Sequence, residues 1–158
     1  MSLYEIKLLI LDVDGTLTDG GIYLSSKGEI IKRFDVKDGY GLVALLKAGI
    51  EPIIITGRES DITKRRAKEL GINEVYQNVH DKSEQIELIL NQKHLTWDNV
   101  AYVGDDINDL VCIENAGFSA CPSDAVSLIK EKAKYVCKLP GGHGAVREVC
   151  DQLLLSIL

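Results

Sequence analysis

Two aspartates separated by one residue stand directly after an apolar run near the N-terminus. The run covers residues 8–11, Asp12 and Asp14 follow it, and Gly15 comes next. An unbroken apolar run that ends near a glycine is typical of a strand buried on both faces. Two carboxylates beside such a strand are costly to keep charged unless a cation or hydrogen-bond donors compensate. Because Mg²⁺ binds one or two carboxylates together with water and phosphate oxygens, the pattern favours a magnesium site over an ordinary turn.

Further polar residues stand at the ends of later apolar runs or at the start of a predicted helix. In a parallel sheet the carboxyl ends of the strands meet at one edge, so these side chains are expected to converge. A hydroxyl, an ammonium, free amides and carboxylates together suit a phosphate held by Mg²⁺, which predicts phosphoryl transfer. One carboxylate can attack phosphorus, and a second can protonate the leaving alcohol and then activate water. The residues of this set are Thr56, Gly57, Lys82, Asp105 and Asp109.

Apolar runs alternate with segments of helical spacing along nearly the whole chain. This alternation predicts an α/β fold, a three-layer sandwich with a mainly parallel, Rossmann-like sheet, in a single domain over residues 1–158. A β-hairpin is predicted over about residues 20–34, and it is too small to be a separate cap domain. Its position after the acidic loop suggests a flap over the site. One helix is expected to follow Gly41, after a loop, and another to cover residues 124–130.

The composition narrows the possible partners. The formal net charge is −6, which argues against nucleic acid or an anionic membrane as the main partner. No apolar segment is long enough to span a bilayer, and the first residues lack a signal-peptide pattern. The four cysteines form no C-x-x-C pair, so they are expected to be reduced, mostly buried thiols of a cytoplasmic protein. A small molecule is the expected partner.

Taken together, these motifs resemble those of the haloacid-dehalogenase-like phosphatases. The aspartate pair, the Thr-Gly pair, the lysine and the acidic loop at 104–109 stand in the order of that family. A closer resemblance covers nearly the full chain. It is to the members that hydrolyse 3-deoxy-D-manno-octulosonate 8-phosphate, an eight-carbon keto-acid sugar phosphate, on the way to lipopolysaccharide. It implies a Mg²⁺-dependent phosphomonoesterase that works through an aspartyl phosphate. The segments that carry it are residues 8–23, 34–41, 54–58, 100–109 and 141–155.

The resemblance also implies roles for individual residues. Asp12 is expected to be the nucleophile and Asp14 the general acid and base. The expected Mg²⁺ ligands are Asp12, the main-chain carbonyl of Asp14, and Asp105. Phosphate contacts are expected from Thr56, Gly57 and Lys82. Asp106 and Asp109 are expected to orient Lys82 or a metal-bound water. Contacts to the sugar acid are expected from Asp14, from the segment Asp35, Val36, Lys37, Asp38 and Gly39, taken as a loop, and from Arg58 and Arg66.

The similar family members are tetramers without a large cap, in which a neighbouring subunit helps to close each site. The resemblance therefore implies a homotetramer, with Arg147 as a candidate to reach a neighbour's site. Three features depart from the pattern: Asp35 stands where Asn is usual, Val43 stands where a basic residue can occur, and the chain is expected to lack a covering tail after Leu158. The glycines at 141, 142 and 144 suit either a plain loop or a close subunit contact.

Three alternatives to this function remain open at this point: one has a different substrate, and two are different classes of protein. A phosphatase for nine-carbon sialic-type acid phosphates differs by one carbon, which changes little binding energy in a pocket. A phospho-receiver signalling domain also forms an aspartyl phosphate, although its acceptor aspartate lies on a middle strand. A non-catalytic oligomerisation module of the same fold is disfavoured because all the expected catalytic positions are occupied by suitable residues.

Overall fold

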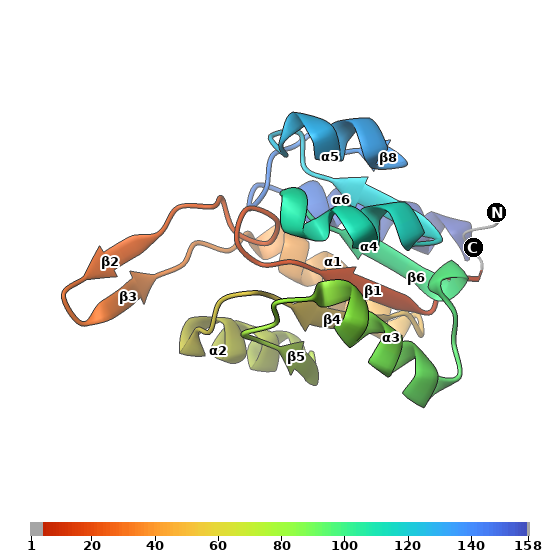
Figure 1. Cartoon of the computed structure of the whole chain (residues 1–158), viewed down its shortest axis with the longest axis horizontal. Helices are drawn as coiled ribbons and strands as arrows, with labels where there is room; N and C mark the ends of the chain where they lie inside the picture. The colour runs from red at the N-terminus through yellow and green to blue at the C-terminus, as the bar shows by residue number, and fades with distance from the viewer. Residues whose placement is uncertain (1–4, 158) are drawn as a thin grey trace.

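The strand β1 lies at the centre of a six-stranded sheet in the computed structural model, which describes residues 5–157 (Figure 1). The strand order is β5-β4-β1-β6-β7-β8, and every neighbouring pair is parallel. The predicted Rossmann-like sheet is therefore confirmed. The strands of this sheet are β1 (Leu8–Leu11), β4 (Glu51–Ile55), β5 (Glu74–Tyr76), β6 (Val100–Val103), β7 (Phe118–Cys121) and β8 (Tyr135–Val136).

Helices cover both faces of the sheet and make the predicted three layers. Leu9 and Leu11 of β1 point into a core shared with α1, α2 and α6, whereas Leu8 and Ile10 point into a core shared with α3, α4 and α5. Figure 1 shows α3 and α4 in front of the sheet and α1 and α6 behind it. Since both faces are covered, β1 is apolar at every position. The helices are α1 (Val36–Lys47), α2 (Asp61–Leu70), α3 (Lys82–Lys93), α4 (Leu110–Asn115), α5 (Ser127–Lys132) and α6 (Ala145–Ser156).

The order of the strands creates a switch point beside β1. After β1 the chain adds β4 and β5 on one side of it, and then returns to add β6, β7 and β8 on the other side. The connections therefore diverge between β1 and β6. Ligands of open α/β sheets bind in the crevice that such a divergence leaves at the carboxyl ends of the strands. Asp12 directly follows β1 and Asp105 follows β6, so both lie at this point.

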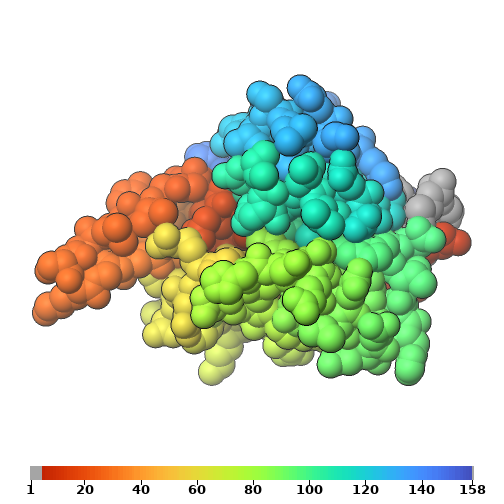
Figure 2. All heavy atoms as spheres, in the orientation of Figure 1, coloured from red at the N-terminus to blue at the C-terminus, as the bar shows by residue number. Residues whose placement is uncertain are grey.

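The hairpin consists of β2 (Tyr23–Ser25) and β3 (Gly28–Ile31), which are antiparallel and separate from the main sheet. Its strands are shorter than the pieces expected within 20–34. Figures 1 and 2 show it as an arm that projects away from the body of the molecule. The arm contacts the chain's own site through Lys32, which follows β3, and through Glu29 of β3, whose carboxylate lies 3.9 Å from the guanidinium of Arg58.

Two helix starts differ from the sequence predictions. α1 begins at Val36, not after Gly41, because the Asp35 side chain accepts a hydrogen bond from the main-chain nitrogen of Lys37 and caps the helix. The expected loop at 35–39 is therefore a cap and a first helical turn. Gly39 inside this helix leaves room for the guanidinium of Arg66, which would have to shift if position 39 carried a Cβ.

The second difference concerns α5, which begins at Ser127 and not at Asp124. Asp124 does not cap this helix. Its carboxylate accepts a hydrogen bond from the main-chain nitrogen of Gly141 at 2.9 Å, and the turn after Pro122 precedes the helix. The side chain that suggested a helix start therefore holds a distant loop in place.

Two further sequence predictions concern the state of the cysteines and the presence of membrane-spanning helices. The four cysteines are all buried and free, as expected. Within residues 5–157, no helix has the length and apolar character that crossing a membrane requires. The predictions that involve the first four residues and Leu158 lie outside the described residues.

Candidate active site

Lys82 joins two of the predicted aspartates. It is the first residue of α3, and its ammonium donates to Asp12 Oδ1 at 2.8 Å and to Asp109 Oδ1 at 2.6 Å. All three side chains are buried. A buried lysine is stable only when it is paired, so these contacts define where its ammonium lies. Burial acts to lower the pKa of Lys82, but the charges and hydrogen bonds of Asp12 and Asp109 together outweigh it, so the pKa is raised.

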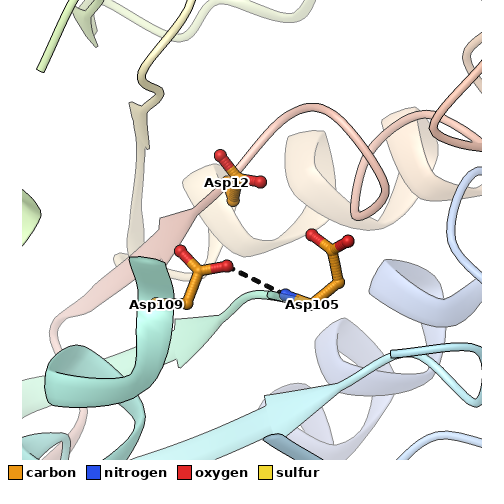
Figure 3. Close-up of side chains that lie close together, drawn as sticks. All are labelled: Asp12, Asp105 and Asp109. Carbon is orange, nitrogen blue, oxygen red and sulfur yellow. Dashed lines mark hydrogen bonds between the residues drawn. The ribbon is translucent and has the colours of Figure 1, made fainter. Parts of the chain in front are cut away.

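The carboxylate of Asp109 is fully occupied by donors from its own chain. Its Oδ1 accepts from Lys82 and from the hydroxyl of Tyr102, which lies 2.5 Å away. Its Oδ2 accepts from the main-chain nitrogens of Asp105 and Asp106 at 2.9 and 3.3 Å. Figure 3 shows the bond to the nitrogen of Asp105. Asp109 therefore orients Lys82 and the acidic loop, and it has little capacity left for another ligand.

Asp105 faces the aspartate pair across the switch point. Its Oδ1 accepts a hydrogen bond from the hydroxyl of Thr16 at 3.1 Å. Gly15, with φ of +91°, lets the loop after β1 pass this carboxylate, because a Cβ there would collide with Asp105 Oδ2. The glycine and the threonine that follow the aspartate pair thus have one shared function: they bring the loop against Asp105.

Asp12, Asp105 and Asp109 each place one carboxylate oxygen within 4.8 Å of the others (Figure 3). One ammonium, that of Lys82, balances these three carboxylates. Burial raises the pKa of Asp12 to about 6, and burial together with the two neighbouring carboxylates raises the pKa of Asp105 to about 8. The three carboxylates thus carry more negative charge than Lys82 can balance. The atoms that they offer to a metal ion are hard carboxylate oxygens. These residues fit a divalent cation such as Mg²⁺, with Asp12 and Asp105 as the ligands.

The side chain of Asp14 lies outside this cluster and has its own cations. Asp14 Oδ1 accepts a hydrogen bond from the ammonium of Lys32 at 2.5 Å. Lys32 is also 2.8 Å from Glu29 Oε1, and Arg58 Nε is 3.8 Å from Asp14 Oδ2. Lys32 directly follows β3 at the base of the hairpin, whereas Glu29 lies within β3, close to the turn. The contact of Lys32 with Asp14 is a place where the hairpin meets the site.

An open pocket of about 200 Å³ lies above the acidic cluster. Acidic, hydroxyl, amide and guanidinium groups share its wall, which suits an anionic ligand held through a cation and an arginine. Most of the side chains predicted for phosphate and catalysis are therefore together. The residues that line the pocket are Asp12, Asp14, Thr56, Gly57, Arg58, Asp105, Asp106 and Asn108.

The remaining residues predicted to contact the sugar do not line this pocket. Arg66 stacks over the ring of Phe34 and lies beside a smaller pocket, which Asp35, Asp38 and Gly39 also line. Val36 and Lys37 are exposed on the first turn of α1. Within one chain these side chains are thus separate from the acidic cluster.

Arg147, predicted to reach a neighbouring subunit, contacts residues of its own chain. Its Nε donates to Asp151 at 2.7 Å, and its guanidinium lies over the ring of Tyr40.

Asp106 was predicted to orient Lys82 or a metal-bound water. Its side chain accepts a hydrogen bond from the main-chain nitrogen of Ile107 and caps the short helix η3 (Ile107–Asp109), so it supports the acidic loop without touching Lys82.

The glycine loop before α6 packs against the loop that carries the aspartates. A Cβ at position 141 would collide with the carbonyl oxygen of Gly15, and one at position 142 would collide with the main chain of Thr18 and Asp19. The main-chain nitrogen of Gly142 donates to the carbonyl of Thr16 at 3.1 Å. These two glycines therefore serve a close contact within the chain.

Sequence reasoning missed four residues that contact the predicted ones. They are Thr16, Glu29, Lys32 and Tyr102. Tyr102 lies in the apolar strand β6, and its buried hydroxyl needs a partner, which is Asp109. Charged residues on a hairpin usually face solvent, so nothing local marked Lys32. Its proximity to Asp14 depends on how the arm leaves the body.

Comparisons with known proteins agree with this geometry. A family model described as haloacid dehalogenase-like hydrolase matches residues 68–148. The 3-deoxy-D-manno-octulosonate 8-phosphate phosphatase KdsC of Escherichia coli is 46% identical over 152 residues, which cover 96% of this chain and 81% of the relative.

Two solved structures are similar over almost the whole chain. The phosphatase of the same name from Moraxella catarrhalis, in complex with magnesium ion, phosphate ion and KDO, has a TM-score of 0.94 and 40% identity. The match covers 98% of this chain and 88% of that one. The cobalt-bound phosphatase from Haemophilus influenzae has a TM-score of 0.95 and 36% identity, and the match covers 99% of this chain and 92% of that one.

Proposed function

Because the chain belongs to the haloacid dehalogenase-like hydrolases and is a phosphoric monoester hydrolase, we propose that it hydrolyses 3-deoxy-D-manno-octulosonate 8-phosphate. The products are the free eight-carbon sugar acid and phosphate. The proposal is supported mainly by the meeting of Asp12, Asp105 and Lys82 at the switch point of the sheet, below an open polar pocket.

We assign the first chemical step to Asp12. One of its carboxylate oxygens attacks the phosphorus atom, the bond between phosphorus and the sugar oxygen breaks, and Asp14 gives its proton to the leaving oxygen. In the second step Asp14, now a carboxylate, takes a proton from water, whose oxygen attacks the phosphorus of the aspartyl phosphate. Phosphate leaves and Asp12 is restored. Both aspartates line the pocket, and Lys82 keeps the carboxylate of Asp12 in one orientation.

Asp12, the main-chain carbonyl of Asp14, and Asp105 are the groups we assign to Mg²⁺. A bound divalent cation supplies charge neutralisation for the phosphate oxygens. Thr56, Gly57 and Lys82 are assigned to the phosphate itself. The assignment of Asp105 to the cation is supported by its raised pKa, which is caused first by burial and then by the neighbouring carboxylates of Asp12 and Asp109.

For the sugar acid we assign Arg58 within the chain, because a guanidinium pairs with a carboxylate through two parallel hydrogen bonds. Arg147 remains the candidate to act from a neighbouring subunit. Of the other residues predicted to contact the sugar acid, we propose the same for Asp35, Val36, Lys37 and Arg66, whereas Asp38 and Gly39 are buried within their own chain.

The proposal also includes the oligomeric state of the protein and its location in the cell. We propose that residues 1–158 form one hydrolase domain and that the chain assembles as a homotetramer. Leu24, Ile30 and Ile31 are apolar side chains that the hairpin exposes, which supports an interface there. We propose a cytoplasmic location, which is supported by four free buried thiols.

A comparison of two substrates tests the proposal. With Mg²⁺ present, we expect kcat/KM for the eight-carbon acid 8-phosphate to exceed that for a nine-carbon sialic-type acid 9-phosphate by about tenfold or more. A preference for the nine-carbon acid would reassign the substrate. Chelation of the metal should remove turnover, and added Mg²⁺ should restore it.

The nucleophile is tested separately from the substrate. Asp12→Asn should reduce turnover below detection while the circular dichroism spectrum stays unchanged. Asp98→Asn, which changes an exposed aspartate, is the matched control and should keep full activity. Substantial turnover by the first variant would contradict the assignment. If the unchanged protein releases no more than one phosphate per chain, a phospho-receiver becomes the better description.

A further inference from the structure

Lys32 is a charged residue buried at the base of an otherwise exposed arm. It follows β3 and is 8% exposed, whereas its apolar neighbours Ile30 and Ile31 are 55% and 54% exposed. This is the reverse of the usual preference, because lysine is rarely buried unless it is paired. A buried ammonium loses several kcal/mol of hydration, so its burial calls for a specific compensating contact.

Two carboxylates supply that contact. The ammonium of Lys32 donates to Asp14 Oδ1 at 2.5 Å. It also lies 2.8 Å from Glu29 Oε1, which is an ion pair without a well-aligned hydrogen bond. The shortest and best-aligned contact of the lysine is therefore with the aspartate assigned to proton transfer. By comparison, Arg58 is half exposed and 3.8 Å away from Asp14, so its contact with the carboxylate is weaker.

The other partner of Lys32 ties the hairpin to the body. Glu29 Oε2 accepts a hydrogen bond from the hydroxyl of Ser60 at 2.6 Å, just before α2. The main-chain nitrogen of Ser60 donates in turn to the side chain of Gln77 at 2.7 Å. The ammonium thus lies between a fixed carboxylate and the carboxylate of Asp14. A movement of the hairpin that displaces the ammonium of Lys32 would therefore change the orientation of the Asp14 side chain.

We propose that Lys32 is a positioning residue for Asp14: by donating to Oδ1 it holds the carboxyl group in the orientation from which a proton on Oδ2 reaches the leaving oxygen, and it couples the base of the hairpin to that orientation. The inference rests on the proposed role of Asp14 as the general acid. Lys32 itself transfers no proton. Glu29 Oε1 lies on another side of the same ammonium, so the lysine is held by two carboxylates at once.

The dependence of the rate on the leaving group tests this role. A sugar alkoxide needs a proton to leave, whereas p-nitrophenolate leaves without one. We expect Lys32→Met to lower kcat/KM for the sugar phosphate by about 100-fold, the usual contribution of general acid catalysis. For p-nitrophenyl phosphate we expect a loss of about threefold or less, because that substrate bypasses the acid. Lys32→Arg should restore part of the loss.

Lys64→Met is the matched control. Lys64 also lies between two carboxylates, those of Glu59 and Asp61, but it is exposed, so its replacement should change neither rate. If Lys32→Met fails to fold, the double variant Lys32→Met with Glu29→Gln removes the unpaired acid and should show the same difference between the substrates. Equal losses for the two substrates, or no loss, would overturn the inference.

Asp14→Asn separates this inference from the proposed function. If Asp14→Asn shows the difference between leaving groups and Lys32→Met does not, the positioning role is wrong and the proposed function stands. If Asp14→Asn hydrolyses the sugar phosphate at the unchanged rate, the acid is another group, and both the assignment of Asp14 and the inference about Lys32 are overturned.

Discussion

At the scale of single residues, the site depends on how many donors each carboxylate already has. Among residues 5–157, Asp109 accepts four hydrogen bonds, Asp14 accepts one from a lysine, and Asp105 accepts one from a threonine hydroxyl. In the proposed function, the same side-chain type thus serves as a support, a positioned acid and a cation ligand. The surroundings of each group decide its role, because a buried carboxylate needs compensation and takes it from the nearest source.

The first prediction concerns Lys82. Its replacement by methionine leaves Asp12 and Asp109 buried without their cation, so Lys82→Met should lower the free energy of unfolding by about 3 kcal/mol. It should also lower kcat/KM by about 1000-fold, since it removes a charge that faces the developing negative charge on phosphate. Chemical denaturation and steady-state kinetics measure the two effects.

Lys132→Met is the control for this prediction, because Lys132 forms a surface ion pair with Glu114 at 3.1 Å. Its effect on stability should be about 1 kcal/mol or less, and its effect on the rate should be negligible. A rate for Lys82→Met that equals that of the unchanged chain would remove Lys82 from the site.

At the scale of elements, a buried aspartate in the first turn of α1 makes the stability of the fold depend on pH. Asp38 is buried there and accepts a hydrogen bond from the main-chain nitrogen of Arg147. Burial raises its pKa from 3.8 to about 6, although that hydrogen bond acts in the opposite direction. Between these two values the folded chain binds more protons than the unfolded chain. Stability must therefore fall as pH rises through this range.

The second prediction follows from that sign. The stabilising contribution of protonated Asp38 is present below pH 3.8 and is lost as pH rises through about 6. The free energy of unfolding should fall across this window by up to about 3 kcal/mol through this residue. Asp38→Asn, which keeps an acceptor for the Arg147 nitrogen, should remove that part of the slope. Asp98→Asn should leave it. Identical slopes for Asp38→Asn and the unchanged chain, measured by denaturation at several pH values, would contradict the prediction.

The third prediction concerns the glycine loop before α6. Gly141→Ala should displace this loop from the main chain of Gly15, because the new methyl group has no space there. We expect a loss of stability of about 2–3 kcal/mol and a marked fall in kcat/KM, since the aspartate loop must move too. Gly49→Ala is the control: its φ is +86° but nothing lies within 4 Å, so it should cost about 1 kcal/mol and leave the rate unchanged. Full activity in the first variant would contradict this account.

At the scale of the whole molecule, the separation of the predicted sugar-contacting residues is the main finding. Within one chain, the aspartates of the acidic cluster, Lys82 and Arg58 lie together at the switch point. The residues around Asp38 and Arg66 line a second pocket, and the hairpin projects from the body (Figure 2). A site that needs both sets requires a second chain. The proposed tetramer would bring the two sets together.

The fourth prediction tests that assembly. Leu24 is 65% exposed on the hairpin, and Leu88 is 53% exposed on α3. If the hairpin forms an interface, Leu24→Arg should lower the molecular mass in solution, because a buried charge without a partner is costly. Leu88→Arg, the matched control, should keep the mass of the unchanged chain. Analytical ultracentrifugation gives the masses, and a tetramer with Leu24→Arg would argue against the hairpin as an interface.

The sequence by itself determined the parallel sheet and the residue types at its carboxyl edge. The apolar run of β1, the alternation of strands and helices, and Asp12, Thr56, Lys82 and Asp105 at strand ends or helix starts are all local signals. They act through hydrophobic periodicity and the geometry of parallel strands, which depend on near neighbours in the chain.

Only the tertiary structure decided which side chain each acid contacts. Lys32 is 18 residues from Asp14, and Thr16 is 89 residues from Asp105, so neither contact leaves a periodic trace in the sequence. The first turn of α1, which was expected as a loop, is capped locally by Asp35, but Gly39 and Gly41 also bring that turn close to the side chains of Arg66 and Cys150, which are distant in the sequence. The physical reason is common to these cases: burial makes a polar group or a close approach depend on one distant partner, and the fold alone selects that partner.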